Sequence, residues 1–82
     1  MNHVKLLFFA TLRDRAGMKS IEIDVPSDLT VQGLKHKISV EYPGLRESMK
    51  SVLITINREY AFDEAVIPQN AEVAMFPPVS GG

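Results

Sequence analysis

The sequence closes with Glu72-Val73-Ala74-Met75-Phe76-Pro77-Pro78-Val79-Ser80-Gly81-Gly82, a strand pattern that runs through two prolines into two glycines. Proline nitrogens cannot donate hydrogen bonds to a sheet, so this strand should end at Phe76. Glycine makes up about 7% of average sequences, so a terminal glycine pair occurs by chance in roughly 0.5% of chains. We therefore expect a folded domain over residues 1–76 and a flexible tail over residues 77–82, whose carboxylate enters another protein and is activated there.

The rest of the chain predicts a small mixed sheet with one main helix. Apolar and β-branched runs predict strands at residues 4–10, 20–25, 51–56, 60–62 and 72–76. A helix should begin after Thr30, whose hydroxyl can cap it, and should end before Pro43. Its apolar face holds Val31, Leu34, Ile38 and Tyr42. Residues 11–17 are predicted to form a charged connection that can include one helical turn. Because this connection is short, the first two strands should form an antiparallel hairpin. The expected fold is α+β, with four to five strands and the helix on one face.

A single helix can cover only one face of this sheet. Side chains alternate along a strand, so the charges of Lys5 and Glu72 mark the face that points outward. Thr55 should point the same way. The apolar residues predicted on this open face are Leu7, Phe9, Leu53 and Phe76, with Tyr60 at the edge. Because Phe76 also begins the tail, we interpret these residues as a docking patch for a protein partner.

Composition limits the other classes of function. The net charge is −1 and the nine Lys and Arg residues are scattered, so we expect neither a nucleic-acid nor a membrane partner. There is no cysteine, which excludes disulfides and thiol nucleophiles and fits a cytoplasmic protein. His3 and His36 are the only histidines, so we predict no metal site and no bound cofactor. The first strand begins so early that we expect no removable leader.

Two stretches carry a resemblance to a known family. These are Leu7-Phe8-Phe9-Ala10-Thr11-Leu12-Arg13, followed by Gly17, and the closing Phe76-Pro77-Pro78-Val79-Ser80-Gly81-Gly82. With them, the chain from Val4 to Gly82 resembles the small subunit of molybdopterin synthase, a ubiquitin-like sulfur carrier with the β-grasp fold. The family often has Asp-Gly in the turn before the last strand, where this chain has Asn70-Ala71, a change compatible with a tight turn.

The resemblance implies the chemistry of the tail. An activating enzyme resembling those of ubiquitin pathways adenylates Gly82 with ATP, and a sulfur donor converts it to a thiocarboxylate; Gly81 provides a thin stem. The carrier then docks on the large catalytic subunit, in a heterotetramer of two small and two large subunits, and supplies sulfur for the dithiolene of molybdopterin. The small subunit is not catalytic alone. Predicted partner-binding residues are Leu7, Phe9, Arg13, Tyr60, Phe76, Pro77 and Pro78.

Three other functions use the same features of the sequence. A sulfur carrier for another product, such as the thiamin thiazole, would share the Gly-Gly end, although such relatives usually lack the Phe-Pro-Pro ending. A ubiquitin-like protein modifier would form isopeptide bonds through Gly82. In a simple binding module the two glycines would be incidental.

Overall fold

The first and last strands of the chain lie side by side at the centre of the sheet. The computed structural model describes residues 1–78, and in it β1 (Asn2–Phe8) pairs in parallel with β5 (Ala71–Phe76). On one side, β2 (Ser20–Val25) pairs antiparallel with β1. On the other side, β3 (Leu53–Ile56) pairs antiparallel with β5, and β4 (Glu59–Tyr60) completes the order β2-β1-β5-β3-β4. The predicted mixed sheet is confirmed, with five strands.

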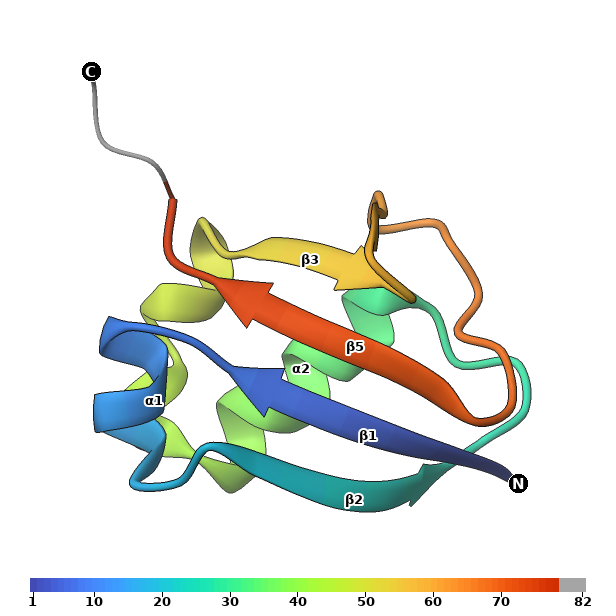
Figure 1. Cartoon of the computed structure of the whole chain (residues 1–82), viewed down its shortest axis with the longest axis horizontal. Coiled ribbons are helices and arrows are strands. Elements are labelled where there is room, and N and C mark those ends of the chain that lie inside the picture. The colour runs from blue at the N-terminus through green and yellow to red at the C-terminus, as the bar shows by residue number, and fades with distance from the viewer. Residues whose placement is uncertain (79–82) are drawn as a thin grey trace.

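The helix α2 (Val31–Glu41) lies behind the sheet in Figure 1 and leaves the other face towards the viewer. It forms where the sequence predicts, because the Thr30 hydroxyl accepts a hydrogen bond from the Gly33 N–H at 3.2 Å. Val31, Leu34 and Ile38 are fully buried on its inner face. From the sheet, this core receives Val4, Leu6, Phe8, Ile54, Val73 and Met75, the alternate residues of three strands.

Several boundaries differ from those predicted. Residues 11–17 contain a six-residue helix, α1 (Thr11–Ala16), which ends at Gly17 in the left-handed conformation. Two 3₁₀ helices, η1 (Pro43–Leu45) and η2 (Ser48–Lys50), follow α2, so β3 begins at Leu53 and not at residue 51. β4 covers Glu59–Tyr60 and not residues 60–62 as predicted, because a turn of only two residues separates it from β3.

The described part of the chain, residues 1–78, contains no helix long and apolar enough to cross a membrane. Within the same residues, no group of three or more His, Asp or Glu side chains is arranged to hold a metal ion. β5 ends at Phe76, where the last strand was predicted to end. Residues 79–82 of the predicted tail lie outside the described residues.

A histidine links β1 to the edge strand β2 at the end of the sheet farthest from the tail. His3 Nε2 lies 2.7 Å from Glu22 Oε1, and His3 Nδ1 lies 3.0 Å from Asp24 Oδ1. Both ring nitrogens can donate only when the imidazole is protonated. The bonds to Glu22 and then to Asp24 therefore raise the pKa of His3 above its ordinary 6.5. The bond to His3 likewise lowers the pKa of the Glu22 carboxyl below 4.5.

We predict that this cluster makes stability depend on pH. The raised pKa of His3 gives stability that is complete below pH 6.5 and is lost as the pH rises through the folded-state value. The lowered pKa of Glu22 gives stability that is present above pH 4.5 and is lost as the pH falls. Urea unfolding should therefore show the free energy of unfolding decreasing above pH 6.5, and His3→Gln should flatten that decrease. An identical slope in the wild-type and His3→Gln proteins would contradict the role of His3.

Candidate functional site

The open face of the sheet carries a row of side chains in register across four strands. Leu7 on β1, Ala74 on β5, Thr55 on β3 and Tyr60 on β4 are successive partners in the sheet. Over this row lies a groove of about 500 Å³, lined by Leu7, Phe9, Thr55, Arg58, Tyr60, Glu72, Ala74 and Phe76. The sheet thus brings together four predicted docking residues, Leu7, Phe9, Tyr60 and Phe76, from three separate segments of the sequence.

Two aromatic rings form the end of this groove nearest the tail. The rings of Phe9 and Phe76 stack with centroids 4.6 Å apart and an interplanar angle of 10°. They meet because β1 and β5 run in parallel, and the Phe9 N–H donates to the Met75 carbonyl at 3.2 Å just beyond the end of β1. Phe9 remains 40% exposed, so the pair presents an apolar surface to a partner.

The tail leaves the sheet directly after this aromatic pair. Pro77 is half-buried and Pro78 is exposed. Both line a shallow hollow of about 250 Å³ between α1 and η2, where Leu12, Arg15 and Ser48 also lie. These prolines are therefore beside the groove and do not line it. The predicted reacting group, the carboxylate of Gly82, and its stem Gly81 lie outside the described residues.

Two other predicted residues lie around the groove. Leu53 is the register partner of Phe76, so it lies on the open face, and it is half-buried. Arg13 lines a separate hollow of about 160 Å³ with Phe9 and Lys19, on the β2 side of the aromatic pair. Arg13 is therefore adjacent to Phe9 but not in the main groove.

Sequence reasoning missed Arg58, which lines the groove from the turn between β3 and β4. The available signal was the pair Asn57-Arg58 between two strand patterns, which is the length of a tight hairpin turn. Thr55 was predicted to point outward; it does lie on the open face, but it is only 8% exposed. It lies in the middle of the row, between its register partners Ala74 and Tyr60.

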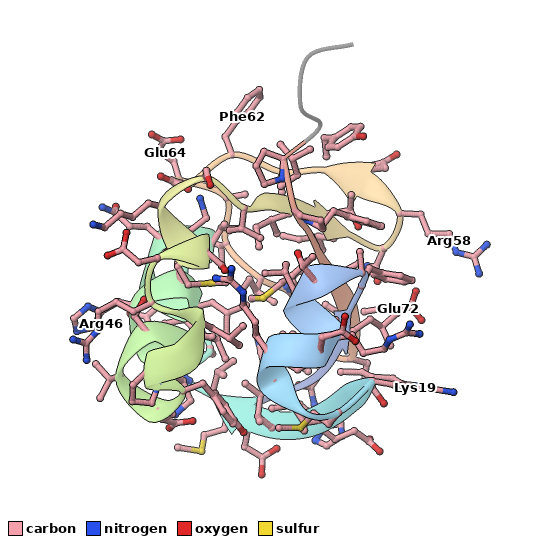
Figure 2. All side chains as sticks on the ribbon, turned by 90° about the vertical axis from the view of Figure 1, so that its left-hand side faces the viewer. Lys19, Arg46, Arg58, Phe62, Glu64 and Glu72 are labelled. Carbon is pink, nitrogen blue, oxygen red and sulfur yellow. The ribbon has the colours of Figure 1, made fainter. Side chains whose placement is uncertain are left out.

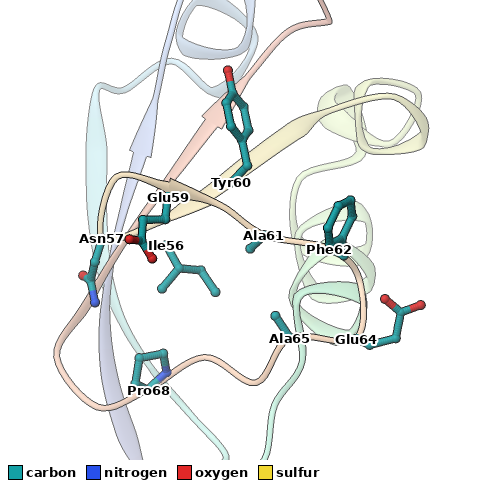
Figure 3. Close-up of a pocket in the computed structure, with 9 residues that line it drawn as sticks. All are labelled: Ile56, Asn57, Glu59, Tyr60, Ala61, Phe62, Glu64, Ala65 and Pro68. Carbon is teal, nitrogen blue, oxygen red and sulfur yellow. The ribbon is translucent and has the colours of Figure 1, made fainter.

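Another hollow lies between the β3–β4 hairpin and the loop that follows β4 (Figure 3). Its volume is about 620 Å³, and Ile56, Ala61, Ala65 and Pro68 form its apolar part. Phe62 and Glu64 stand at its rim, and Phe62 is 81% exposed. Tyr60 is the one predicted docking residue among the described side chains that line it.

Comparison with known proteins identifies the fold as the ubiquitin-like β-grasp. The crystal structure of small archaeal modifier protein 1 from Haloferax volcanii matches with a TM-score of 0.82 and 25% identity, covering 96% of this chain and 100% of that one. A putative molybdopterin converting factor, subunit 1, from Pyrococcus furiosus matches with a TM-score of 0.86 and 26% identity, over the same shares of the two chains.

The ThiS family matches residues 6–82, and the chain belongs to that family. The molybdopterin synthase sulfur carrier subunit of Dictyostelium discoideum is 37% identical over 84 residues, covering 99% of this chain and 98% of that protein. The resemblance predicted from the two sequence stretches is therefore confirmed across the whole chain. The family match extends to Gly82, so it includes the Gly-Gly end.

We predict that the stacked rings of Phe9 and Phe76 are energetically coupled. Stacked aromatic pairs contribute about 0.5–1.5 kcal/mol beyond the area they bury. A double-mutant cycle with Phe9→Leu and Phe76→Leu, measured by urea unfolding, should show a coupling energy within this range. Leucine keeps most of the apolar volume, so the cycle isolates the ring contact; strictly additive effects would contradict stacking in solution.

Proposed function

We propose that this chain is the sulfur carrier subunit of molybdopterin synthase. The observation that carries the proposal is the apolar groove ending in Phe9 and Phe76, directly where the chain leaves the sheet towards Gly81-Gly82. Membership of the ThiS family and the names of the relatives support the same function. The groove binds the partner protein, and the tail carries the sulfur at Gly82 into that partner.

The chemistry proposed for Gly82 follows from the poor reactivity of a carboxylate. The carboxylate attacks the α-phosphorus of ATP on an activating enzyme, and pyrophosphate leaves. The acyl carbon then has a good leaving group, so hydrosulfide supplied by a sulfur donor displaces AMP, loses its proton and leaves a thiocarboxylate. Glycine at this position keeps the carbonyl uncrowded and lets the backbone enter a narrow channel. ATP is thus used by the activating enzyme, and the carrier itself holds no cofactor.

The tail is long enough to carry the Gly82 carboxyl group into a pocket of a partner protein while the domain stays at the interface. Four residues follow Pro78, and an extended chain of four residues spans at most about 13–14 Å. Ordering each of these residues costs about 1–2 kcal/mol, so the tail alone would bind weakly. The proposed role of the groove is to offset this cost by burying Phe9 and Phe76 against the partner, while Pro77 and Pro78 restrict the root of the tail.

The partners proposed for this cycle are three proteins. The large subunit of molybdopterin synthase receives the sulfur, in a heterotetramer of two small and two large subunits. A ubiquitin-activating-like adenylyltransferase charges the tail, and a separate protein donates the sulfur. The catalytic groups belong to these partners, so the carrier is not an enzyme alone.

A second candidate function is protein modification. It is favoured by the structural match to small archaeal modifier protein 1, which covers 96% of this chain. Both functions begin with adenylation of the terminal glycine. They differ in what attacks the activated carbon: a sulfur donor in the carrier, and a lysine amine in the modifier. An immunoblot for conjugates of higher mass, compared with co-purification of a large synthase subunit, distinguishes them.

The absence of cysteine makes the sulfur directly detectable. After incubation with ATP, the activating enzyme and a sulfur donor, the chain should gain one site for a thiol-directed alkylating reagent. Peptide mapping should place the label at Gly82. The four methionines can gain oxygen, with nearly the same mass change, but they do not take this label.

Variants of the tail provide the controls for this labelling. A chain lacking Gly82, and a chain with one residue added after it, should keep the fold but take no label and support no molybdopterin synthesis. The proposal that sulfur is transferred from Gly82 is wrong in either of two cases. In the first, the wild-type chain takes no label after incubation with ATP, the activating enzyme and the sulfur donor. In the second, the extended chain still supports molybdopterin synthesis without proteolytic trimming.

We predict that Phe76→Asp disrupts docking more than folding. Aromatic anchors at the centre of an interface commonly contribute about 2 kcal/mol or more. Calorimetry should therefore show at least about a 30-fold weaker affinity for the large subunit. Phe62→Asp is the matched control, because Phe62 is 81% exposed and does not line the open-face groove. Equal losses in the two variants, or an unfolded Phe76→Asp chain by circular dichroism, would contradict the assignment of the open face.

A further inference from the structure

The turn between β3 and β4 holds two residues in a conformation that most amino acids avoid. Asn57 has φ 50° and Arg58 has φ 72°, and they are the only two residues between the paired positions Ile56 and Glu59. A two-residue hairpin turn of this kind favours Asn-Gly, because both positions need positive φ. At the second position this chain has arginine, whose Cβ is crowded in the left-handed region.

The asparagine of this turn is explained by the fold. The Asn57 N–H donates to the Glu72 carbonyl at 2.8 Å, and the Glu72 N–H donates to Asn57 Oδ1 at 2.9 Å. These two bonds fasten the turn to β5, and asparagine tolerates positive φ better than most residues. The position of Asn57 therefore has a structural reason.

Nothing in the fold explains the arginine. The Arg58 side chain is exposed, and within residues 1–78 its guanidinium forms neither a salt bridge nor a hydrogen bond. Figure 2 shows it extending into solvent on the same side of the molecule as Glu72, while Arg46 points away on the opposite side. Strained backbone positions tend to persist where function requires the residue that is strained.

The surroundings of Arg58 indicate what it can bind. It lines one side of the groove whose centre is apolar, with Phe9 and Phe76 at one end and Glu72 beside the turn. Arg13 and Lys19 lie on the other side of the aromatic pair, and neither forms a salt bridge within residues 1–78. Although the net charge is −1, the apolar centre is therefore flanked by free cations on both sides. A complementary surface has an apolar centre and carboxylates at its rim.

We propose that Arg58 is a docking residue whose guanidinium pairs with a carboxylate of the large synthase subunit. This inference rests on the proposed function and adds a specific contact to it. Arginine suits this role because its planar fork can donate two parallel hydrogen bonds to one carboxylate. The backbone strain at Arg58 is a stability cost that the free carrier bears for this contact.

The test is Arg58→Gly, which should change stability and binding in opposite directions. Glycine adopts positive φ freely, so the melting temperature of the free carrier should rise by roughly 4–8 °C. The dissociation constant for the large subunit should rise about tenfold at low salt, and its dependence on salt should become weaker. Arg58→Lys should keep the salt dependence but recover only part of the affinity.

Two control variants separate charge from strain. Arg46→Gln removes the same charge on the opposite side of the molecule and should leave the affinity unchanged. Asn70→Gly relieves another positive φ, of 60°, in the turn before β5, away from the groove lining. It should not change the affinity for the large subunit.

Several outcomes would overturn the inference. If Arg58→Gly binds the large subunit like wild type while Phe76→Asp does not, the inference about Arg58 is wrong and the proposed function stands. A lower melting temperature for Arg58→Gly would show that the arginine stabilises the fold, which also overturns it. If Arg58→Gly weakens binding to the activating enzyme but not to the large subunit, the proposed partner of Arg58 is wrong. If the wild-type carrier does not bind the large subunit at all, the proposed function fails with it.

Discussion

The parallel pairing of β1 with β5 is the constraint on which the rest of the structure depends. It joins the two ends of the folded domain at the centre of the sheet and aligns Phe8 with Met75. Beyond that pair, Phe9 and Phe76 stack at the end of these two strands, where the chain leaves the sheet. The apolar surface and the root of the tail are therefore products of one strand pairing, and a partner that binds the surface also receives the tail.

Periodicity predicted much of this arrangement, because burial in a small sheet obliges side chains to alternate. The core positions Leu6, Phe8, Ile54, Val73 and Met75 are all buried, and Thr30 caps α2 as expected. The open face could be deduced because one helix covers only one side. The Gly-Gly end and the residues around it also indicated the family, which the comparisons confirm.

The missed features depend on backbone conformation and not on periodicity. The two-residue turn at Asn57-Arg58 displaced β4 from its predicted place, since arginine gives no warning of a positive φ. The burial of Thr55 on the open face depends on its neighbours across three strands, which no single segment of sequence contains. The role of Arg58 was hidden for the same reason: its significance comes from the strain and from the groove, both of which require the fold.

The central claim is that the chain delivers sulfur from Gly82 after docking through its open face. The most direct measurement is a single-turnover reaction of chemically prepared thiocarboxylated chain with the large subunit and its pyranopterin substrate, without ATP or the activating enzyme. Intact-mass analysis should show each chain returning to the ordinary carboxylate, with two chains consumed per dithiolene formed. A chain that keeps its sulfur in the presence of substrate, or that becomes joined to a lysine of the large subunit, would contradict the claim.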